Sequence, residues 1–181
     1  VLPGGEPVAV KVQRPGIRTL VRSDLAILQA FALLAERVNR VARDLRLTSA
    51  VHEFGRWTLK ELDFEIEAHN ADVFRRNFTG WDDVIFPRVH WSHTTARVLT
   101  MLRVSGLRVS EVSEKVGPEV GRRLEKRLAK TEMIMFITVG FFHADLHPGT
   151  LSFQPAVRYA LFVLGVLGDM APEQRAGFLH S

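Results

Sequence analysis

The feature that most limits what this chain can fold into is a long stretch of helical periodicity between residues 17 and 44. Apolar side chains recur there every three to five residues among charged ones, which predicts one amphipathic helix that packs through its apolar side. A second helical pattern runs from about residue 48, where Thr48 or Ser49 can cap the helix, to about residue 78. The apolar residues expected to pack are Leu20, Leu25, Leu28, Ala32, Ala35, Val38 and Val41 in the first helix and Val51, Phe54, Leu62 and Ile66 in the second.

Shorter segments have the patterns of strands and of further helices. Residues 8–13 alternate, so that Val8, Val10 and Val12 share the side expected to be buried and Lys11 lies on the other side. The remaining predicted elements are strands at 81–91 and 96–104, a short helix near residue 110, a helix from 118 to 140 and a closing hairpin at 156–164. Together these elements predict an α+β fold.

The loop at residues 141–150 carries the densest group of reactive side chains in the sequence. In phosphotransferases with a kinase-like loop, an Asp accepts the proton of the attacking hydroxyl, and an Asn that holds a metal follows five positions later. Asp145 occupies the first position and Thr150 the second. A competing interpretation makes His143, Asp145 and His147 the metal ligands of a hydrolase, because alternate residues of an extended segment project to one side. The other His residues are scattered singly, which favours the phosphotransferase loop.

Composition excludes several classes of protein. The chain of 181 residues contains no cysteine, so disulfides, thiol catalysis and zinc sites built on cysteine are ruled out. No apolar run approaches the roughly 20 residues that span a bilayer, so no transmembrane segment is expected. The 24 Lys and Arg residues exceed the 20 Asp and Glu residues. They are dispersed among acids, which is typical of a solvated surface and argues against nucleic acid as a partner.

Several of these segments together resemble the UbiB/AarF family of atypical kinases. The run VAVKVQRPG at residues 8–16 matches the family segment around its phosphate-binding lysine, which implies that Lys11 holds the α- and β-phosphates of ATP. Residues 141–150 match the family's HADPHPGN loop, with Leu146 in place of Pro and Thr150 in place of Asn. The resemblance covers nearly the whole chain. It implies a partial, two-lobed protein-kinase-like fold, with a nucleotide-binding lobe at 1–105 that includes an inserted helix and a helical lobe at 106–181.

The acidic helix carries the expected partner of Lys11. By resemblance, the family's Glu-x-Asp element falls at Glu61 and Asp63, and the glutamate that pairs with the lysine falls at Glu67. On one continuous helix Asp63 and Glu67 share a face, whereas Glu61 lies about 120° away from Glu67. We therefore expect an ion pair between Lys11 and Glu67, with Asp63 as the nearest competitor. The resemblance also implies that Met101 borders the adenine slot, which the backbone of residues 102–104 lines.

Two departures from the family pattern fall at metal-binding positions. Thr150 replaces one magnesium ligand, and Val163 stands where the family has the Asp of its Asp-Phe-Gly element. The resemblance implies ATP and Mg²⁺ as cofactors, with His143 and Asp145 in the catalytic loop. Because valine cannot bind a metal and a threonine hydroxyl is a weak ligand, phosphoryl transfer is expected to be impaired.

The family is associated with quinone and isoprenoid-lipid metabolism, which implies nucleotide and the lipids or proteins of that metabolism as partners, and a cytoplasmic location that can be peripheral to a membrane. A pseudokinase that acts as a binding module and a non-functional remnant are the alternatives to an active kinase or ATPase. Relative to the family, the chain opens inside the nucleotide lobe and stops soon after Gly168. A fragment or a degenerate copy is therefore expected, which in isolation is poorly soluble or needs a partner.

Overall fold

The computed structural model describes residues 1–136, 141–143, 151–154, 158–161 and 167–169. The helices are α1 (Ile17–Val38), α2 (Arg40–Asp44), α3 (Leu47–Glu61), α4 (Phe64–Asn77), α5 (Val109–Val116) and α6 (Pro118–Ile134), with a 3-10 turn at Trp91–His93. The strands are β1 (Val8–Val12), β2 (Val84–Ile85), β3 (Val98–Leu102), β4 (Leu107–Arg108), β5 (Phe141–His143), β6 (Leu151–Gln154), β7 (Arg158–Leu161) and β8 (Leu167–Asp169). The mixture confirms the predicted α+β class.

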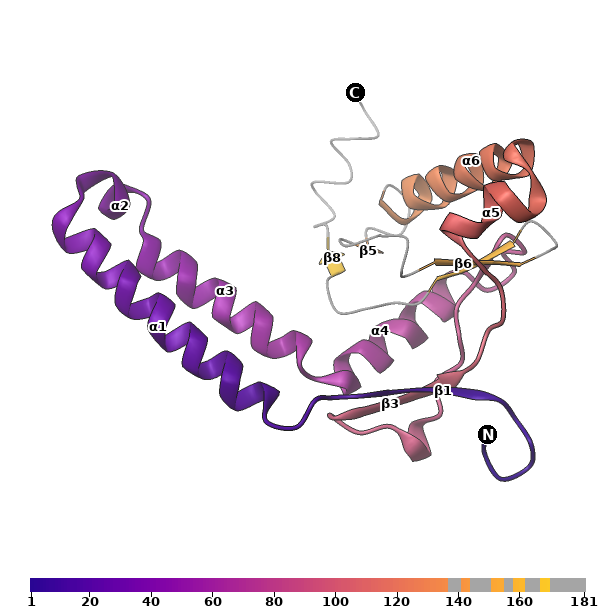
Figure 1. Ribbon diagram of the computed structural model, residues 1–181, viewed down its shortest axis with the longest axis horizontal. Coiled ribbons are helices and arrows are strands. Elements are labelled where there is room, and N and C mark those ends of the chain that lie inside the picture. The colour runs from indigo at the N-terminus through magenta and orange to yellow at the C-terminus, as the bar shows by residue number, and fades with distance from the viewer. Residues whose placement is uncertain (137–140, 144–150, 155–157, 162–166, 170–181) are drawn as a thin grey trace.

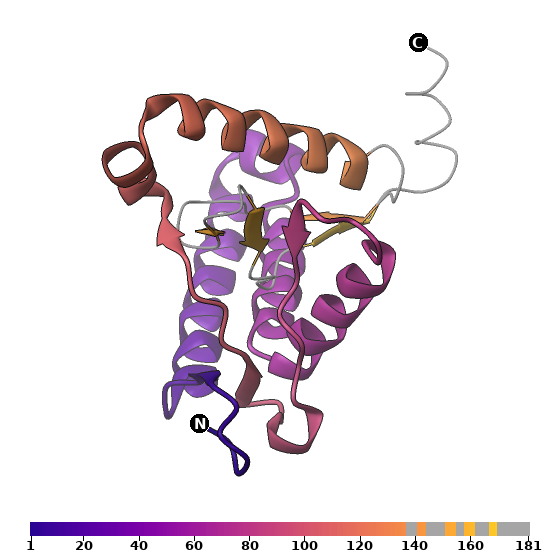
Figure 2. The same cartoon turned by 90° about the vertical axis from the view of Figure 1, so that its right-hand side faces the viewer.

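Helices α1 and α3 form a long antiparallel hairpin that projects from the rest of the molecule, with α2 at its far end (Figure 1). Helix α4 begins at the base of this hairpin. It lies between the antiparallel ladder of β1 and β3 and a second sheet with the strand order β2-β7-β6-β4, in which β2 and β7 are parallel. Helix α6 lies on the far side of that second sheet from the β1–β3 ladder (Figure 2). Strands β5 and β8 pair separately and antiparallel.

The hydrophobic core surrounds α4. Phe74 of this helix is fully buried and stacks on Phe86, with the ring centroids 5.3 Å apart. Phe78, one turn further along α4, contacts the same ring at 5.4 Å. The core continues into the ladder through Leu99 and into the second sheet through Tyr159, both of which are fully buried. Because aromatic rings bury large apolar areas, this cluster fixes α4 between the two sheets.

The first predicted helix, at residues 17–44, is two helices. After α1 ends at Val38, Asn39 is extended, and its side-chain oxygen accepts hydrogen bonds from the backbone N–H groups of Val41 and Ala42. The prediction of one continuous helix was therefore wrong. The physical reason is local, because an asparagine side chain that bonds to nearby N–H groups competes with continuation of the helix.

The second predicted helix, at residues 48–78, is also two helices. Helix α3 ends at Glu61, and the Asp63 carboxylate accepts a hydrogen bond from the Glu65 N–H at 3.0 Å and so caps α4. Helix α3 itself begins at Leu47, after Arg46 in a left-handed conformation with φ of 51° and without a side-chain cap. The predicted capping by Thr48 or Ser49 was therefore wrong.

Many apolar residues predicted to face inward are exposed. In the hairpin, α1 packs on α3 along one narrow stripe that includes Ala32 and Gly55, and a Cβ atom on Gly55 would lie 3.2 Å from the Leu25 side chain. A two-helix hairpin buries only this stripe on each helix, so the other apolar side chains face solvent. The exposed hairpin residues that contradict the prediction are Leu20, Leu28, Val38, Val41 and Phe54, and Ile66 of α4 is exposed as well.

The strands differ from their predicted positions as well. The segments at 81–91 and 96–104 contribute only β2 and β3, which join different sheets, and a single bridge between Val89 and Met101 connects the two segments. The closing hairpin consists of β6 and β7, so it begins earlier than predicted. On β1, Val10 and Val12 are 54% and 65% exposed, because α4 covers the opposite side of the ladder. The prediction that the side of Val8, Val10 and Val12 is buried was therefore wrong. Helix α6 ends at Ile134, and the predicted end at Gly140 lies outside the described residues.

Candidate functional site

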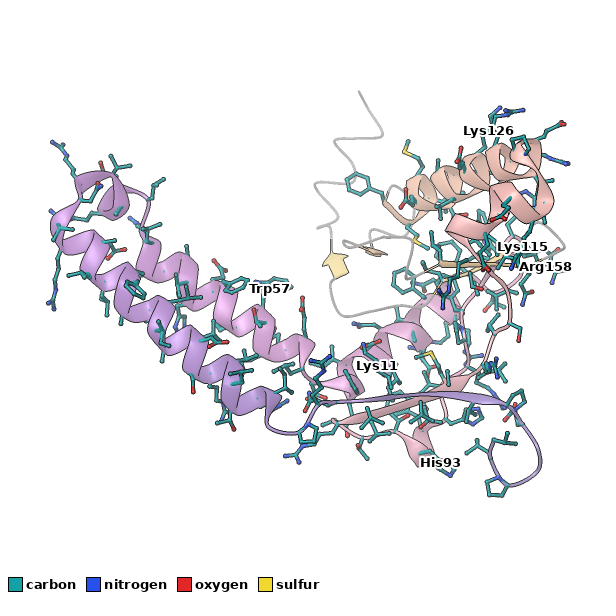
Figure 3. All side chains as sticks on the ribbon, viewed as in Figure 1. Lys11, Trp57, His93, Lys115, Lys126 and Arg158 are labelled. Carbon is teal, nitrogen blue, oxygen red and sulfur yellow. The ribbon has the colours of Figure 1, made fainter. Side chains whose placement is uncertain are left out.

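Lys11 points from β1 toward α4 (Figure 3) and forms the predicted ion pair with Glu67. Its ammonium Nζ lies 2.8 Å from one carboxylate oxygen of Glu67 and 3.2 Å from the other. The alternation of β1 explains the direction, because side chains at successive strand positions project to opposite sides. The Lys11 side chain is 41% exposed whereas that of Glu67 is 2% exposed. The lysine therefore reaches from a buried carboxylate to the molecular surface.

Glu67 lies near the start of α4, and its side chain is buried. Burial raises the pKa of its carboxyl above the usual value of 4.5, while the hydrogen bond and the charge of Lys11 act in the opposite direction and offset part of this effect. A buried carboxylate is stable only when it is paired. The contact with Lys11 supplies that partner and fixes the position of the ammonium group.

Phe64 supports the same lysine, although the sequence reasoning missed it. The Lys11 ammonium lies 4.7 Å from the centre of the Phe64 ring, a cation–π distance, and Phe64 is itself buried. Phe64 is the first residue of α4 and lies three positions before Glu67, so both side chains leave the helix on neighbouring faces. The spacing within α4 does not predict this contact, because the contact depends on the angle at which α4 meets β1.

Two hydrogen bonds hold the base of the hairpin next to this pair. The Gln13 side-chain amide donates to the Leu62 carbonyl oxygen at 2.7 Å and so joins the chain just after β1 to the chain just after α3. The Phe64 backbone N–H donates to the Ala96 carbonyl oxygen at 3.2 Å and ties the start of α4 to the segment before β3. These bonds orient α4 relative to β1, which is what brings Glu67 to Lys11.

The other acidic residues singled out in the sequence lie elsewhere. Asp63 is the N-terminal cap of α4, so it does not compete for Lys11, and Glu61 is the last residue of α3. The expected geometry, with all three acids on one helix, was wrong because the helix is interrupted at Leu62 and Asp63. Lys11 contacts the carboxylate of Glu67.

The segment expected to line an adenine slot is part of the core and of the backbone hydrogen-bond network. Met101 is 8% exposed and stands opposite Ala9 in the ladder between β1 and β3. The N–H of Leu102 donates to the Arg88 carbonyl at 2.8 Å, and the N–H of Arg103 donates to the Pro7 carbonyl at 3.0 Å. These two N–H groups are therefore used within the protein and are not available to a ligand.

The catalytic-loop predictions fall mostly outside the described residues. Asp145, His147, Thr150 and Val163 all lie there, so their roles stay predictions. His143 is the last residue of β5, and its backbone stands opposite Leu167 of β8. Within the described part of the chain, no three His, Cys, Asp or Glu side chains gather into a group that can hold a metal ion.

A groove of about 380 Å³ lies between α1 and α3, away from Lys11 and Glu67. Leu25 and Leu59 contribute apolar side chains to it, and Arg22, His52 and Arg56 contribute polar ones. It follows the packing seam of the hairpin rather than the ion pair. In the described ranges, none of the helices has the length and apolar character that crossing a membrane requires.

Comparison with known proteins gives consistent matches. The family described as "ABC1 atypical kinase-like domain" matches residues 1–181. "Probable protein kinase UbiB" of Azotobacter vinelandii is 36% identical over 179 residues, which cover 94% of this chain and 33% of that protein. An "uncharacterized aarF domain-containing protein kinase" of Arabidopsis thaliana, described as chloroplastic, is 34% identical over 177 residues, which cover 98% of this chain and 24% of that protein. The chain thus spans a third or less of the length of these two relatives.

A solved structure has the same fold. It is the complex of Rv3197 with erythromycin from Mycobacterium tuberculosis, which superposes with a TM-score of 0.79 at 24% sequence identity. The superposition covers 94% of this chain and 42% of that protein. At this level of identity the likeness concerns the arrangement of helices and strands alone.

Proposed function

This chain belongs to the family of ABC1 atypical kinase-like domains, and from this premise we propose that Lys11 and Glu67 form the phosphate-holding part of a nucleotide site. The proposed activity class is ATP binding with hydrolysis or phosphoryl transfer. The observation that carries the proposal is the contact of the Lys11 ammonium with both oxygens of a buried carboxylate from a helix more than 50 positions away in the sequence.

The ion pair has the properties that such a role requires. An ammonium group has three N–H donors, and its two contacts with Glu67 leave at least one donor for a phosphate oxygen. The exposed fraction of Lys11, 41%, gives a ligand access to the ammonium, while Glu67 and Phe64 keep the side chain from swinging away. In this proposal Lys11 binds the α- and β-phosphates, and Glu67 and Phe64 are positioning residues.

The catalytic half of the proposed site rests on the family resemblance. Asp145 would accept the proton of the attacking hydroxyl, and His143 precedes it by two positions in the sequence. A bound magnesium ion supplies charge neutralisation between the phosphates, and hard cations of this kind need oxygen ligands. Thr150 and Val163 stand at the two ligand positions, so we propose that metal-dependent turnover is weak in this chain.

These two substitutions also favour a second candidate, a pseudokinase that binds nucleotide or a protein partner without turnover. Both candidates share the lysine site and differ in the metal requirement. For either candidate, we propose that the substrates and partners belong to the quinone or isoprenoid-lipid metabolism associated with the family.

Nucleotide titration of the lysine variant tests the proposal. We expect Lys11→Met to weaken ATP binding about tenfold or more, because a hydrogen bond to a charged group contributes ~1.5–3 kcal/mol. Lys126→Met is the matched control, since Lys126 is an exposed lysine on α6, remote from β1 (Figure 3). Isothermal titration calorimetry measures both, and circular dichroism verifies that each variant is folded. Equal affinity of Lys11→Met and the wild type for ATP would refute the assignment.

The same titration tests the proposed impairment of the metal site. With weak metal ligands, adding magnesium is expected to change the affinity for ATP little. The double variant Thr150→Asn with Val163→Asp is expected to restore part of the magnesium dependence, because it supplies an amide and a carboxylate oxygen. A strong magnesium effect in the wild type would contradict the proposed impairment and leave the lysine assignment intact.

A further inference from the structure

The hairpin of α1 and α3 presents different side chains on its two faces. The groove described above brings Arg22 of α1 and His52 of α3 to one face. Successive residues of a helix are about 100° apart, so side chains that lie about 140–180° from Arg22 or from His52 around their own helix point to the opposite face. We call the large residues at these positions the apolar face: Leu20, Ile27, Phe31, Val38, Phe54 and Trp57.

The apolar face is exposed along the whole hairpin. Its four members from α1 are, in chain order, 57%, 55%, 65% and 79% exposed, and its two aromatic members from α3 are 57% and 53% exposed. Among the described residues, α1 packs mainly on α3 and α2, which lie on other sides of it. An exposed apolar surface that continues over two helices marks an interaction site.

The size of the apolar face matches that of a stable protein interface. A large apolar side chain removes on the order of 100–200 Å² from water when it is fully buried, so the exposed parts of these six side chains amount to roughly 500 Å². Apolar atoms make up about 60% of an interface. The corresponding interface therefore covers about 800 Å² on each partner, which is the standard size.

The charges of the hairpin favour a second copy in the opposite orientation. Asp24 is exposed on the same side of α1 as the apolar face, and Arg46 is exposed at the far end of the hairpin. Because Gly55 lies beside Leu25, Arg46 is level with about residue 34 of α1. Asp24 and residue 34 are equally far from residue 29, the middle of the apolar face on α1. Two copies that meet antiparallel therefore place the acid of each level with the arginine of the other.

The shape of the molecule allows this arrangement. The hairpin projects from the body of the protein, and β1, β3 and α4 lie at its base (Figure 1). When two hairpins overlap antiparallel, the two bodies lie at opposite ends. The helices α1 and α3 of both copies then form a four-helix bundle around the two apolar faces. Such a pair is closed, because each copy uses the same surface.

We propose that the apolar face is a dimerisation surface, on which the hairpin of a second copy of this chain packs antiparallel to the first. The pairing buries the aromatic and aliphatic side chains of both copies and brings Asp24 of each toward Arg46 of the other. It does not depend on the nucleotide site proposed above, because Lys11 and Glu67 lie outside the apolar face.

Cross-linking of single-cysteine variants tests the proposal, because the chain has no cysteine of its own. Ala50 is exposed on the side of the apolar face and level with residue 30 of α1, so the two copies of Ala50→Cys are expected to lie close together near the two-fold axis. A short bismaleimide is expected to join them into a covalent dimer. Ser49→Cys is the matched control and is expected to give about tenfold less dimer, because its thiol points to the face of the groove. No more dimer from Ala50→Cys than from Ser49→Cys would overturn the proposal and leave a different protein as the partner of the apolar face.

Substitutions on the two faces locate the contact. In the Ala50→Cys chain, Phe31→Ser is expected to reduce the yield of dimer about tenfold, since the interface loses a large apolar side chain. The control is Leu33→Ser, because Leu33 is 47% exposed but lies only about 20° from Arg22 around α1, on the face of the groove. Both side chains are exposed, so neither change removes core packing, and circular dichroism verifies the fold. Equal loss in both variants would contradict pairing through the apolar face.

Charge reversal tests the orientation. In the Ala50→Cys chain, Arg46→Glu is expected to lower the yield of dimer about threefold, because it places two acids at the same level. Adding Asp24→Arg is expected to restore the yield, since opposite charges meet again, whereas Arg122→Glu on α6 is expected to change it little. No recovery in the double reversal would mean that the hairpins do not pair antiparallel, and the proposal would be wrong.

Discussion

Glu67 has a carboxyl group whose burial opposes its ionisation, although a lysine lies beside it. Burial raises the pKa of this carboxyl, whereas the contact with Lys11 at 2.8 Å lowers it. The effect of burial is the larger of the two. A carboxyl whose pKa is higher in the folded than in the unfolded chain stabilises the fold most below the unfolded value of 4.5. That contribution is lost as the pH rises through the folded-state pKa.

A pH series of unfolding experiments with Glu67→Gln tests this description. The variant keeps a hydrogen-bond acceptor for Lys11 and cannot ionise, so its stability relative to the wild type is expected to increase between about pH 4 and pH 7. Urea midpoints measure the difference. Glu65→Gln, in the same helix but exposed, is the control and should follow the wild type at every pH. If the stability of the wild type relative to Glu67→Gln increased as the pH rises, the expected sign would be contradicted.

At the scale of single residues, the sequence located the lysine and its partner but not their surroundings. The alternation of residues 8–13 and the family resemblance together select Lys11 and Glu67, and the structure brings these two together. Phe64 escaped notice because a cation–π contact depends on the angle at which α4 meets β1, and no spacing within one segment encodes that angle. Asp63 was misplaced for a related reason, since a cap and a helix-interior acid look alike in a periodic pattern.

At the scale of elements, the sequence predicted where helices occur better than where they end. The periodicity of 17–44 and 48–78 corresponds to α1 to α4, yet the breaks at Asn39 and at Leu62–Asp63 interrupt it. Both breaks use side chains that bond to nearby backbone groups, an option that hydrophobic periodicity does not register. The inward faces were mispredicted because α1 packs mainly on α3, and a sequence pattern does not state how many neighbours an element has.

The single tyrosine on strand β7 can be used to test how closely the layer of β6 and β7 is packed. Tyr159 on this strand is fully buried beneath α6, and its burial raises the pKa of its phenol to about 12. It is the only tyrosine in the chain, so the absorbance of tyrosinate at 295 nm reports on it alone.

We expect the absorbance of the folded chain to titrate at about 12 and that of the chain in concentrated urea near its ordinary value of about 10. Because the folded pKa is the higher one, the stabilising contribution is complete below the unfolded pKa and is lost as the pH rises through the folded pKa. Tyr159→Phe is the control, since it should abolish the signal. Titration of the folded chain near the ordinary value would mean that the layer of β6 and β7 leaves the phenol open to water.

At the scale of the whole molecule, the described structure leaves apolar surface uncovered at two places, the hairpin and the outer side of β1. Among the described residues β1 has one neighbouring strand, β3, so its other edge offers unpaired backbone groups next to the exposed Val10 and Val12. An exposed strand edge beside apolar side chains is a template for association between chains.

Sedimentation at increasing protein concentration tests this consequence. The wild type is expected to self-associate, and Val10→Lys is expected to weaken the association about tenfold, because a charge on an edge strand opposes pairing with a second chain. Val116→Lys on α5 is the control, since it adds the same charge at an exposed valine away from the edge. A wild type that remains monomeric, or an equal effect of both variants, would show that β1 is not the site of association.

The hairpin also changes the length of the loop that must be closed to form the ion pair. Lys11 and Glu67 are 56 positions apart, and the entropy lost on closing a flexible loop grows with its length. Helices α1 and α3 are joined by residues 39–46, which include α2, so they pair as near neighbours in the sequence. Once they are paired, only the short segments 13–16 and 62–63 separate the hairpin from β1 and from α4. Lys11 and Glu67 are then joined by a short effective loop, so that less entropy is lost when the ion pair forms.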